Sequence, residues 1–418
     1  MKVKKYPMDG YKANLIITNR YTSMFMTFLF EMKYTKKNIY LCDLLAEYML
    51  NTNKFYKTGK SIYNRCNTYY NMNISIDNYH IGTQLFVEVS YTFLDPELVK
   101  DDYLNKAIKF ASQMLFYPNF GEKLDSKVLK KIKNQMIESK ANWLSNPINR
   151  GRIEFIKNFA PNSFLSEDLI ESKEEYSELL NSFTEEDVMN MHKNILNRHF
   201  VGAYLAGNFN KEHLMTVKKY FKFNHVAKLN TNYNDFMPFD NVKDLTISSD
   251  SLSESSLIVI YKVVDYSPSK EFTYLSIEKI LNYVGMLLHR VLRDEMHLVY
   301  SASAYFNIRA AYFRINASIS KENMSQTLMG IEKVWDLLKD EKYLEEIIPK
   351  IKKDVQLDFY TEDENHNRVF SRMISEDCKW QPKIKKVMDS YANLTVQDIV
   401  EAVNSLKKIC VFFYRGDK

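Results

Sequence analysis

The stretch NIYLCDLLAEYMLNT, residues 38–52, places a carboxylate inside a regular apolar pattern. Four apolar residues from Leu41 to Tyr48 fall at positions i, i+3, i+4 and i+7, which predicts an amphipathic helix with one buried face. Glu47 lies within that pattern. Two metal-binding side chains at i and i+4 of a helix, with a glutamate beside them, can hold a metal ion and activate water. Here the i, i+4 pair is Leu44 and Tyr48, so local chemistry predicts a core helix.

The other residues that could carry chemistry form no recognisable motif. Ten glycines leave little room for a phosphate-binding loop, and no GxSxG, P-loop or GxGxxG sequence is present. The acidic run at 362–366 is typical of a solvated helix end rather than a metal site. The eight histidines form no HxxxH or HxxEH pair; they include His80, His192, His199, His289, His297 and His366.

Length and composition predict a globular protein with two domains. The chain has 418 residues, which is more than one core usually holds, and it is 45% hydrophobic and 26% charged. The formal net charge of +5 is spread over the sequence without a long basic run. Nucleic acid is therefore not an expected partner.

Cysteine usage and hydropathy predict a cytoplasmic location. Cys42, Cys66, Cys378 and Cys410 are far apart and form no CxxC, which is typical of reduced thiols. The first residues carry positive charge but no apolar segment follows them, so we expect no signal peptide. No apolar run is long enough to predict a transmembrane span.

The sequence contains an internal duplication with a period of about half the chain. FTEEDVMNMHKNILNRHFVGAYLAGNFN around Thr184 is similar to LTVQDIVEAVNSLKKICVFFYRGDK around Thr395. In each copy the Thr can cap a helix, and the helix leads into a β-branched and aromatic strand. These strands are expected to end at Gly207 and Gly416.

The same order of elements can be followed upstream in both halves. Each half has a strand-like run, an amphipathic helix (residues 271–296 in the second half), two long strands and then further helices. Two copies of a β-α-β-β-α-α-α-β unit predict an α+β fold with two homologous domains, each an antiparallel-rich sheet packed on helices. We expect domains at 1–225 and 242–418, joined by a polar linker at 226–241.

The duplication and one local segment resemble the M16 (insulinase/pitrilysin) peptidases, of the short bacterial M16B-like type, over essentially the whole chain. LLHRVLRDEMHLVYSASAYF in the second half is similar to a conserved family segment, with Arg293 and Tyr300 at the R-x6-Y spacing. The resemblance implies a half-shell arrangement of the two domains. It also implies that Arg293 and Tyr300 bind the substrate carbonyl and stabilise the oxyanion formed at zinc. The alternative is a surface arginine paired with Asp294 or Glu295 beside an ordinary strand tyrosine.

The family's zinc motif, HxxEH, is degenerate in this sequence. By the resemblance, the motif positions are Leu44, Glu47 and Tyr48, and the third ligand position is Ser139, next to Glu138. Leucine cannot ligate zinc, and a neutral phenol is a poor replacement for imidazole. We therefore expect no metal and no cofactor in this chain, with zinc held by a partner.

The resemblance to non-catalytic, YmfF-like members implies a catalytically silent subunit of a heterodimeric metallopeptidase. Its expected partner is a homologous chain with HxxEH, and its expected substrates are peptides, including precursor or leader peptides of ribosomal natural products. One alternative is a non-enzymatic M16-like scaffold or peptide-binding core subunit. Another is a self-sufficient enzyme that uses Glu47, Tyr48 and Glu138 with some metal.

Overall fold

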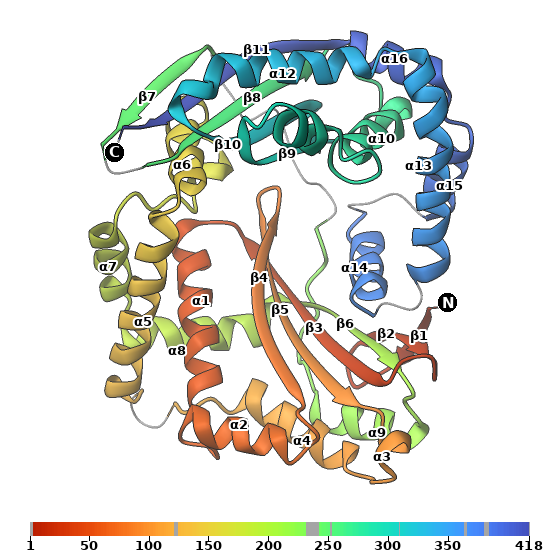
Figure 1. Cartoon of the computed structure of the whole chain (residues 1–418). Helices are drawn as coiled ribbons and strands as arrows, with labels where there is room; N and C mark the ends of the chain where they lie inside the picture. Colours follow the sequence, from red (N-terminus) through yellow and green to blue (C-terminus); the bar gives the residue numbers. More distant parts are fainter. Residues whose placement is uncertain are drawn as a thin grey trace. The chain divides into compact units, whose positions relative to one another are not determined.

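The computed structural model describes residues 3–120, 124–230, 242–250, 253–308, 310–362, 366–379 and 384–417. It divides into two compact units, each assembled from three segments of the chain (Figure 1). Unit 1 comprises Met1–Lys140, Ser172–Asn234 and Glu362–Gln381. Unit 2 comprises Ala141–Glu171, Asp235–Thr361 and Pro382–Lys418.

Unit 1 is built on a six-stranded sheet in the order β1-β2-β6-β3-β5-β4. The central strand β3 is antiparallel to β5 and β6, whereas β2 and β6 run parallel. Its sequence SMFMTFLFEMK is buried along nearly its whole length, as expected for a strand covered on both faces. The strands are β1 (Lys4–Pro7), β2 (Lys12–Ile17), β3 (Ser23–Lys33), β4 (Asn73–Ile81), β5 (Gln84–Leu94) and β6 (Phe200–Gly207).

Helices cover one face of this sheet, with α1 against β4 and β5 and α4 against β5. Aromatic rings fill much of the space beneath them, and Phe28 stacks on Phe221 with ring centroids 4.4 Å apart. The helices of this unit are α1 (Lys36–Asn51), α2 (Gly59–Asn67), α3 (Pro96–Val99), α4 (Leu104–Phe116), α5 (Ser126–Leu144, ending in unit 2), α7 (Lys173–Ser182), α8 (Glu185–Asn194), α9 (Lys211–Tyr220) and α14 (His366–Asp377).

Unit 2 repeats the order of five of the six strands of unit 1, β2-β6-β3-β5-β4. Its sheet runs β7-β11-β8-β10-β9, and β7 and β11 form a parallel pair that matches β2 and β6. This agreement confirms the two homologous α+β domains that the sequence predicts. The strands are β7 (Leu245–Ser249), β8 (Ser255–Val263), β9 (Val299–Asn307), β10 (Tyr312–Ile319) and β11 (Leu406–Gly416).

The helices of unit 2 pack mainly on one face of its sheet, around a core that includes Ile277, Trp335 and Ile351. They are α6 (Pro147–Phe159), α10 (Glu271–Asn282), α11 (Leu287–His289), α12 (Met324–Leu337), α13 (Glu341–Glu362), α15 (Ile384–Ala392) and α16 (Val396–Asn404).

Two helices are exchanged between the halves of the sequence. Helix α14 comes from the second half, yet its Phe370 and Ile374 pack on Phe25 and Leu29 of the unit 1 sheet. Helix α6 comes from the first half and packs on β8 and β11 of unit 2. Both helices occupy the same place in their repeats, third from the closing strand, so the exchange follows the duplication.

Local signals predicted from the two repeat ends are present. Thr184 and Asp187 form a capping box at α8, and Thr395 and Asp398 form the same box at α16. Strands β6 and β11 end at Gly207 and Gly416 as expected. Gly207 has φ +134°, and a Cβ there would lie 2.9 Å from Met24 Cα, so this strand end requires glycine.

The structure differs from one predicted helix, and it does not describe most of the predicted linker. The helix expected over 271–296 ends at Asn282 and resumes at Leu287, because Met286 adopts a left-handed conformation with φ 42°. Of the expected linker at 226–241, residues 231–241 lie outside the described residues. No helix in the described part of the chain is long and apolar enough to cross a membrane.

Candidate functional site

Helix α1 carries Leu44 and Tyr48 on its buried face. The helix begins at Thr35, whose side chain accepts a hydrogen bond from the Asn38 amide. Leu44 and Tyr48 are both 0% exposed. The prediction of a core helix is therefore confirmed, and both positions are closed to solvent.

The Tyr48 hydroxyl forms hydrogen bonds with two main-chain groups around it. It donates a hydrogen bond to the Asn119 carbonyl at 3.0 Å and accepts one from the Asp125 amide at 3.1 Å. The ring stacks on Phe120 with centroids 6.0 Å apart. Burial raises the pKa of this phenol, so it stays protonated at neutral pH. Tyr48 is a structural residue that holds the chain between α4 and α5.

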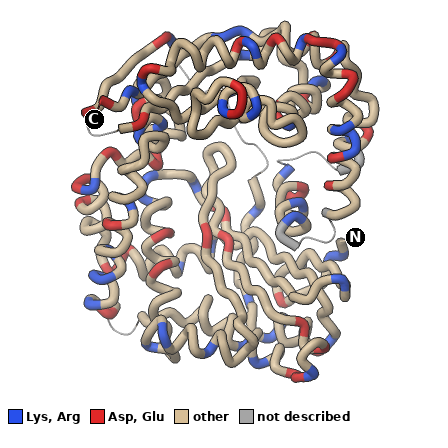
Figure 2. Tube along the Cα trace, viewed as in Figure 1, with Lys and Arg blue, Asp and Glu red and all other residues tan. Residues whose placement is uncertain are grey.

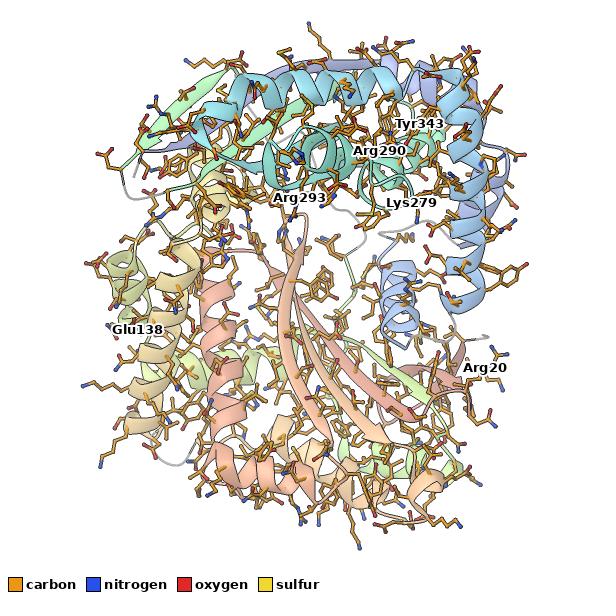
Figure 3. The ribbon with its side chains drawn as sticks, viewed as in Figure 1. Arg20, Glu138, Lys279, Arg290, Arg293 and Tyr343 are labelled. Carbon is orange, nitrogen blue, oxygen red and sulfur yellow. The ribbon has the colours of Figure 1, made fainter. Side chains whose placement is uncertain are left out.

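The remaining zinc-motif positions do not complete a ligand set. Glu47 and Ser139 are exposed on α1 and α5. Glu138 has a side chain 68% exposed and pairs with Lys173 of α7 at 2.6 Å, on the side of α5 near α7 (Figure 3). Within the described ranges, no three His, Cys, Asp or Glu side chains group as metal ligands. Since Leu44 offers no donor atom and Tyr48 offers only a paired phenol, these residues do not fit a zinc ion.

Asp43 is a partly buried acidic residue of α1 that the sequence patterns did not single out. Asn78 of β4 donates to its carboxylate at 2.6 Å. Burial raises the pKa of Asp43 to about 6, while the Asn78 hydrogen bond and nearby Lys140 oppose the rise. The spacing of apolar residues does not predict that Asp43 is shielded from solvent, because position 43 lies at the border of the buried face of the helix.

In unit 2 the structure brings Arg293 and Tyr300 together. Arg293 lies in a π-helical turn, Arg290–Glu295, and Tyr300 is the second residue of the edge strand β9. The Arg293 guanidinium donates to the Tyr300 carbonyl at 3.1 Å. The Tyr300 side chain is 54% exposed, and its hydroxyl lies 3.0 Å from Ser320 Oγ. The sequence spacing thus corresponds to a real contact, made through the main chain.

The local backbone around this pair is unusual. Single π-helical turns are rare and are often found at functional sites. Here the turn is followed by His297 with a positive φ of 54°, which directs the chain into β9. Register with β10 shifts between Ser318 and Ile319, next to Tyr300. The turn and the bulge together fix where the arginine and the tyrosine lie.

The acidic neighbours of Arg293 are bonded to other groups. Glu295 pairs with Arg290 at 3.7 Å and with Lys333 at 2.9 Å, and Asp294 lies 3.3 Å from His289. Arg290 also stacks over Tyr343, as Figure 3 shows. Among the described residues no carboxylate lies within ion-pair distance of Arg293, so the alternative of a pairing with Asp294 or Glu295 is wrong.

Comparison with known proteins relates this geometry to a family. Residues 182–355 match the Peptidase M16 inactive domain. Among curated proteins, none matches the sequence.

Solved structures match the fold over the whole chain. A conserved protein from Enterococcus faecalis V583 aligns with TM-score 0.81 and 16% identity, covering 100% of this chain and 99% of that one. A protease from Helicobacter pylori aligns with TM-score 0.72 and 13% identity, over 99% of both chains. A peptidase M16 inactive domain from Pseudomonas fluorescens aligns with TM-score 0.71 and 15% identity, over 100% of this chain and 99% of that one.

The fold and the site together define a duplicated α+β protein whose described residues hold no zinc-ligand set at the expected positions. Residues 182–355 are similar to the Peptidase M16 inactive domain, and the whole chain has the fold of these solved structures, in agreement with the resemblance found in its sequence.

Proposed function

We propose that this chain is the catalytically silent subunit of a heterodimeric zinc metallopeptidase. A homologous M16 partner with an intact HxxEH motif supplies the zinc ion and the general base. Arg293 and Tyr300 of this chain complete the partner's active site. The complex cleaves peptides in the cytoplasm, and precursor or leader peptides of ribosomal natural products belong to that substrate class.

The observation that carries the proposal is the pairing of Arg293 with Tyr300. The guanidinium has no carboxylate partner among the described residues, and one N–H is already oriented by the Tyr300 carbonyl at 3.1 Å. A guanidinium and a phenol held in this way offer donors to a peptide carbonyl whose oxygen becomes negatively charged during hydrolysis. Both side chains are exposed beside an edge strand, where they are accessible to a substrate bound by a second chain.

The first repeat supports the silent role. Leu44 and Tyr48 are buried in place of ligands, and the Tyr48 hydroxyl already has two main-chain partners. Restoring metal binding would require both side chains to change. An active complex built on this chain therefore needs its zinc from another subunit.

The test is a cleavage assay on the chain and an HxxEH-bearing homologue encoded beside it, each alone and together. Cleavage should require both. Arg293→Ala should lower kcat/KM of the complex by about 10²–10³, which is the scale for losing one oxyanion donor. Arg415→Ala is the matched control, because Arg415 is an exposed arginine of the same unit that pairs with Asp417 at 2.7 Å. It should leave the rate unchanged.

An intact complex whose rate is insensitive to Arg293→Ala would contradict the assignment of Arg293. A complex that binds peptides without cleaving them would instead favour the alternative, an M16-like scaffold or peptide-binding subunit.

A further inference from the structure

One face of the unit 1 sheet carries helix α14, which packs on it through Val369, Phe370, Met373 and Ile374. Strands β3, β5 and β4 extend beside this helix (Figure 1). A cavity of about 670 Å³ lies there, and every residue that lines it belongs to unit 1.

Polar side chains form the floor of this cavity in cross-strand rows. Ser75 of β4 stands opposite Ser90 of β5, whose hydroxyl lies 2.8 Å from that of Thr27 on β3. In the next row Asp77 of β4 stands directly opposite Glu88 of β5. Figure 2 shows acidic positions side by side on this hairpin.

The pair of carboxylates is energetically unusual. Residues directly opposite each other in an antiparallel pair have Cβ atoms about 4.5–5.5 Å apart, and like charges there are destabilising. Ser90 donates to the Glu88 carboxylate at 2.8 Å, which relieves part of the charge. Burial raises the pKa of Glu88, the Ser90 hydrogen bond opposes this rise, and Asp77 adds to it.

The described residues that line the cavity include no lysine or arginine that could compensate this pair. His80 also lines the cavity, and its ring contacts that of Tyr34 at a tilt of 33°, with centroids 4.5 Å apart. The remaining walls combine aromatic side chains, Phe25, Tyr79 and Phe370, with polar ones such as Asn73 and Ser371.

This combination selects a class of ligand. Two carboxylates do not provide the six to eight oxygens that calcium prefers, and the cavity is far larger than a bare ion. Its volume is that of a site for an organic ligand. An apolar stem suits the aromatic walls, which also attract a cationic head group.

We infer that this cavity binds the side chain of an arginine or lysine in a peptide, with its cationic group between Asp77 and Glu88 and its stem against Phe25, Tyr79 and Phe370. The inference goes beyond the proposed function. It concerns a binding site of this chain's own first unit and does not require a partner.

The test measures binding of fluorescein-labelled heptapeptides to the isolated full-length chain by fluorescence anisotropy. One peptide carries a single arginine among alanines, and a second carries citrulline at the same position, which keeps the shape but removes the charge. The arginine peptide should bind at least about 10-fold more tightly than the citrulline peptide, in line with a charge-assisted contact. Equal affinity for the two peptides would overturn the inference.

Isosteric variants assign the effect to the cavity. Asp77→Asn with Glu88→Gln should weaken binding of the arginine peptide at least about 10-fold and leave the citrulline peptide unaffected. The melting temperature should stay equal or rise, because the like-charge pair is removed. Glu174→Gln with Glu178→Gln is the matched control, since both are exposed residues of α7 in the same unit. Equal weakening by both double variants would show a general charge effect and contradict the site.

A free amine and a peptide side chain share the same chemistry, so agmatine serves as the second probe. Agmatine should compete with the arginine peptide only weakly, because it lacks the neighbouring peptide groups. Tighter binding of agmatine than of the peptide would contradict the peptide assignment.

Discussion

Asp43 shows how a single residue of α1 is set by contacts from other elements. It sits one position before Leu44, where its carboxylate accepts a hydrogen bond from Asn78 at 2.6 Å. Lys140 of α5 favours its charged form, and Glu47 disfavours it. The ammonium of Lys140 lies over the ring of Tyr40 at 5.7 Å and over that of Tyr176 at 5.8 Å. Burial outweighs the favourable contacts and raises the pKa of Asp43 to about 6.

Asp43→Asn should stabilise the protein more at pH 7 than at pH 4. In the native state the pKa of Asp43 is raised from 3.8 to about 6, so folding favours its protonated form. The unfolding free energy of the natural protein therefore falls as pH rises from about 4 to 6, and the asparagine variant lacks this loss. The difference between the two should grow by up to about 2–3 kcal/mol over that range.

Urea denaturation of both proteins at a series of pH values measures this difference. Glu178→Gln is the control, since it neutralises an exposed carboxylate on α7. If the difference in unfolding free energy between the wild type and Asp43→Asn did not change with pH, the raised pKa of Asp43 in the folded protein would be contradicted.

Sequence patterns predicted which residues of α1 are buried, but not the hydrogen bonds that these residues make. Apolar spacing alone was enough to predict that Leu44 and Tyr48 lie in the core. It could not show that the Tyr48 hydroxyl bonds to Asn119 and Asp125, because those bonds depend on how a distant loop returns to the helix. The opposition of Asp77 and Glu88 likewise depends on strand register, which the sequence does not state directly.

At the scale of elements, the docking of α6 on the unit 2 sheet depends on a close approach. Gly151 of α6 faces Ser256 of β8, and a Cβ on Gly151 would lie 2.7 Å from both Cβ and Oγ of Ser256. Tyr414 Cβ would be 3.5 Å away. Since the Ser256 Cβ is fixed to the strand, the helix itself must move to accept a larger residue.

Gly151→Ala should therefore destabilise the protein, although alanine favours a helix over glycine. We expect a loss of about 1–3 kcal/mol in the free energy of unfolding, the range for overpacking a core. Chemical denaturation measures it. Adding Ser256→Gly to this variant should restore part of the stability, because it removes the atoms that the new methyl group meets.

Gly59→Ala provides the matched control for this prediction. Gly59 begins α2, and its added Cβ would have Asn51 Oδ1 as its nearest neighbour at 3.4 Å. The substitution should be neutral or stabilising by up to about 1 kcal/mol. If Gly151→Ala were as well tolerated as Gly59→Ala, the close docking of α6 would be contradicted.

Elements were predictable where their signals are local. The capping threonines at 184 and 395 and the strands ending at Gly207 and Gly416 can all be predicted from a few adjacent residues. The break in the helix predicted over 271–296 was not predictable in this way. A Cβ on Gly285 would lie 2.8 Å from the Tyr343 hydroxyl of α13, so a residue far along the sequence helps to set that backbone.

At the scale of the whole molecule, the duplication was predictable and the helix exchange was not. Repeated element order in the sequence predicts two homologous domains, and the shared strand order confirms them. An amphipathic pattern shows that α6 or α14 has a face to bury, but not which sheet buries it. The boundaries at 225 and 242 remain a prediction, since each packed unit contains segments from both halves.

The exchange predicts that the two halves of the chain depend on each other to fold. A fragment of residues 1–230 lacks α14, so Phe25, Leu29 and neighbouring core residues would lose the apolar cover that Phe370 and Ile374 provide. Expressed alone, it should bind a hydrophobic dye and show weak hydrogen-exchange protection in β2, β3 and β6.

Mixing the first fragment with residues 242–418 should restore protection of these strands, whereas the same second fragment carrying Phe370→Asp should restore less. Met329→Asp is the control, because Met329 is 69% exposed on α12. Full protection of these strands in the first fragment alone would contradict a structural role for the exchanged helix.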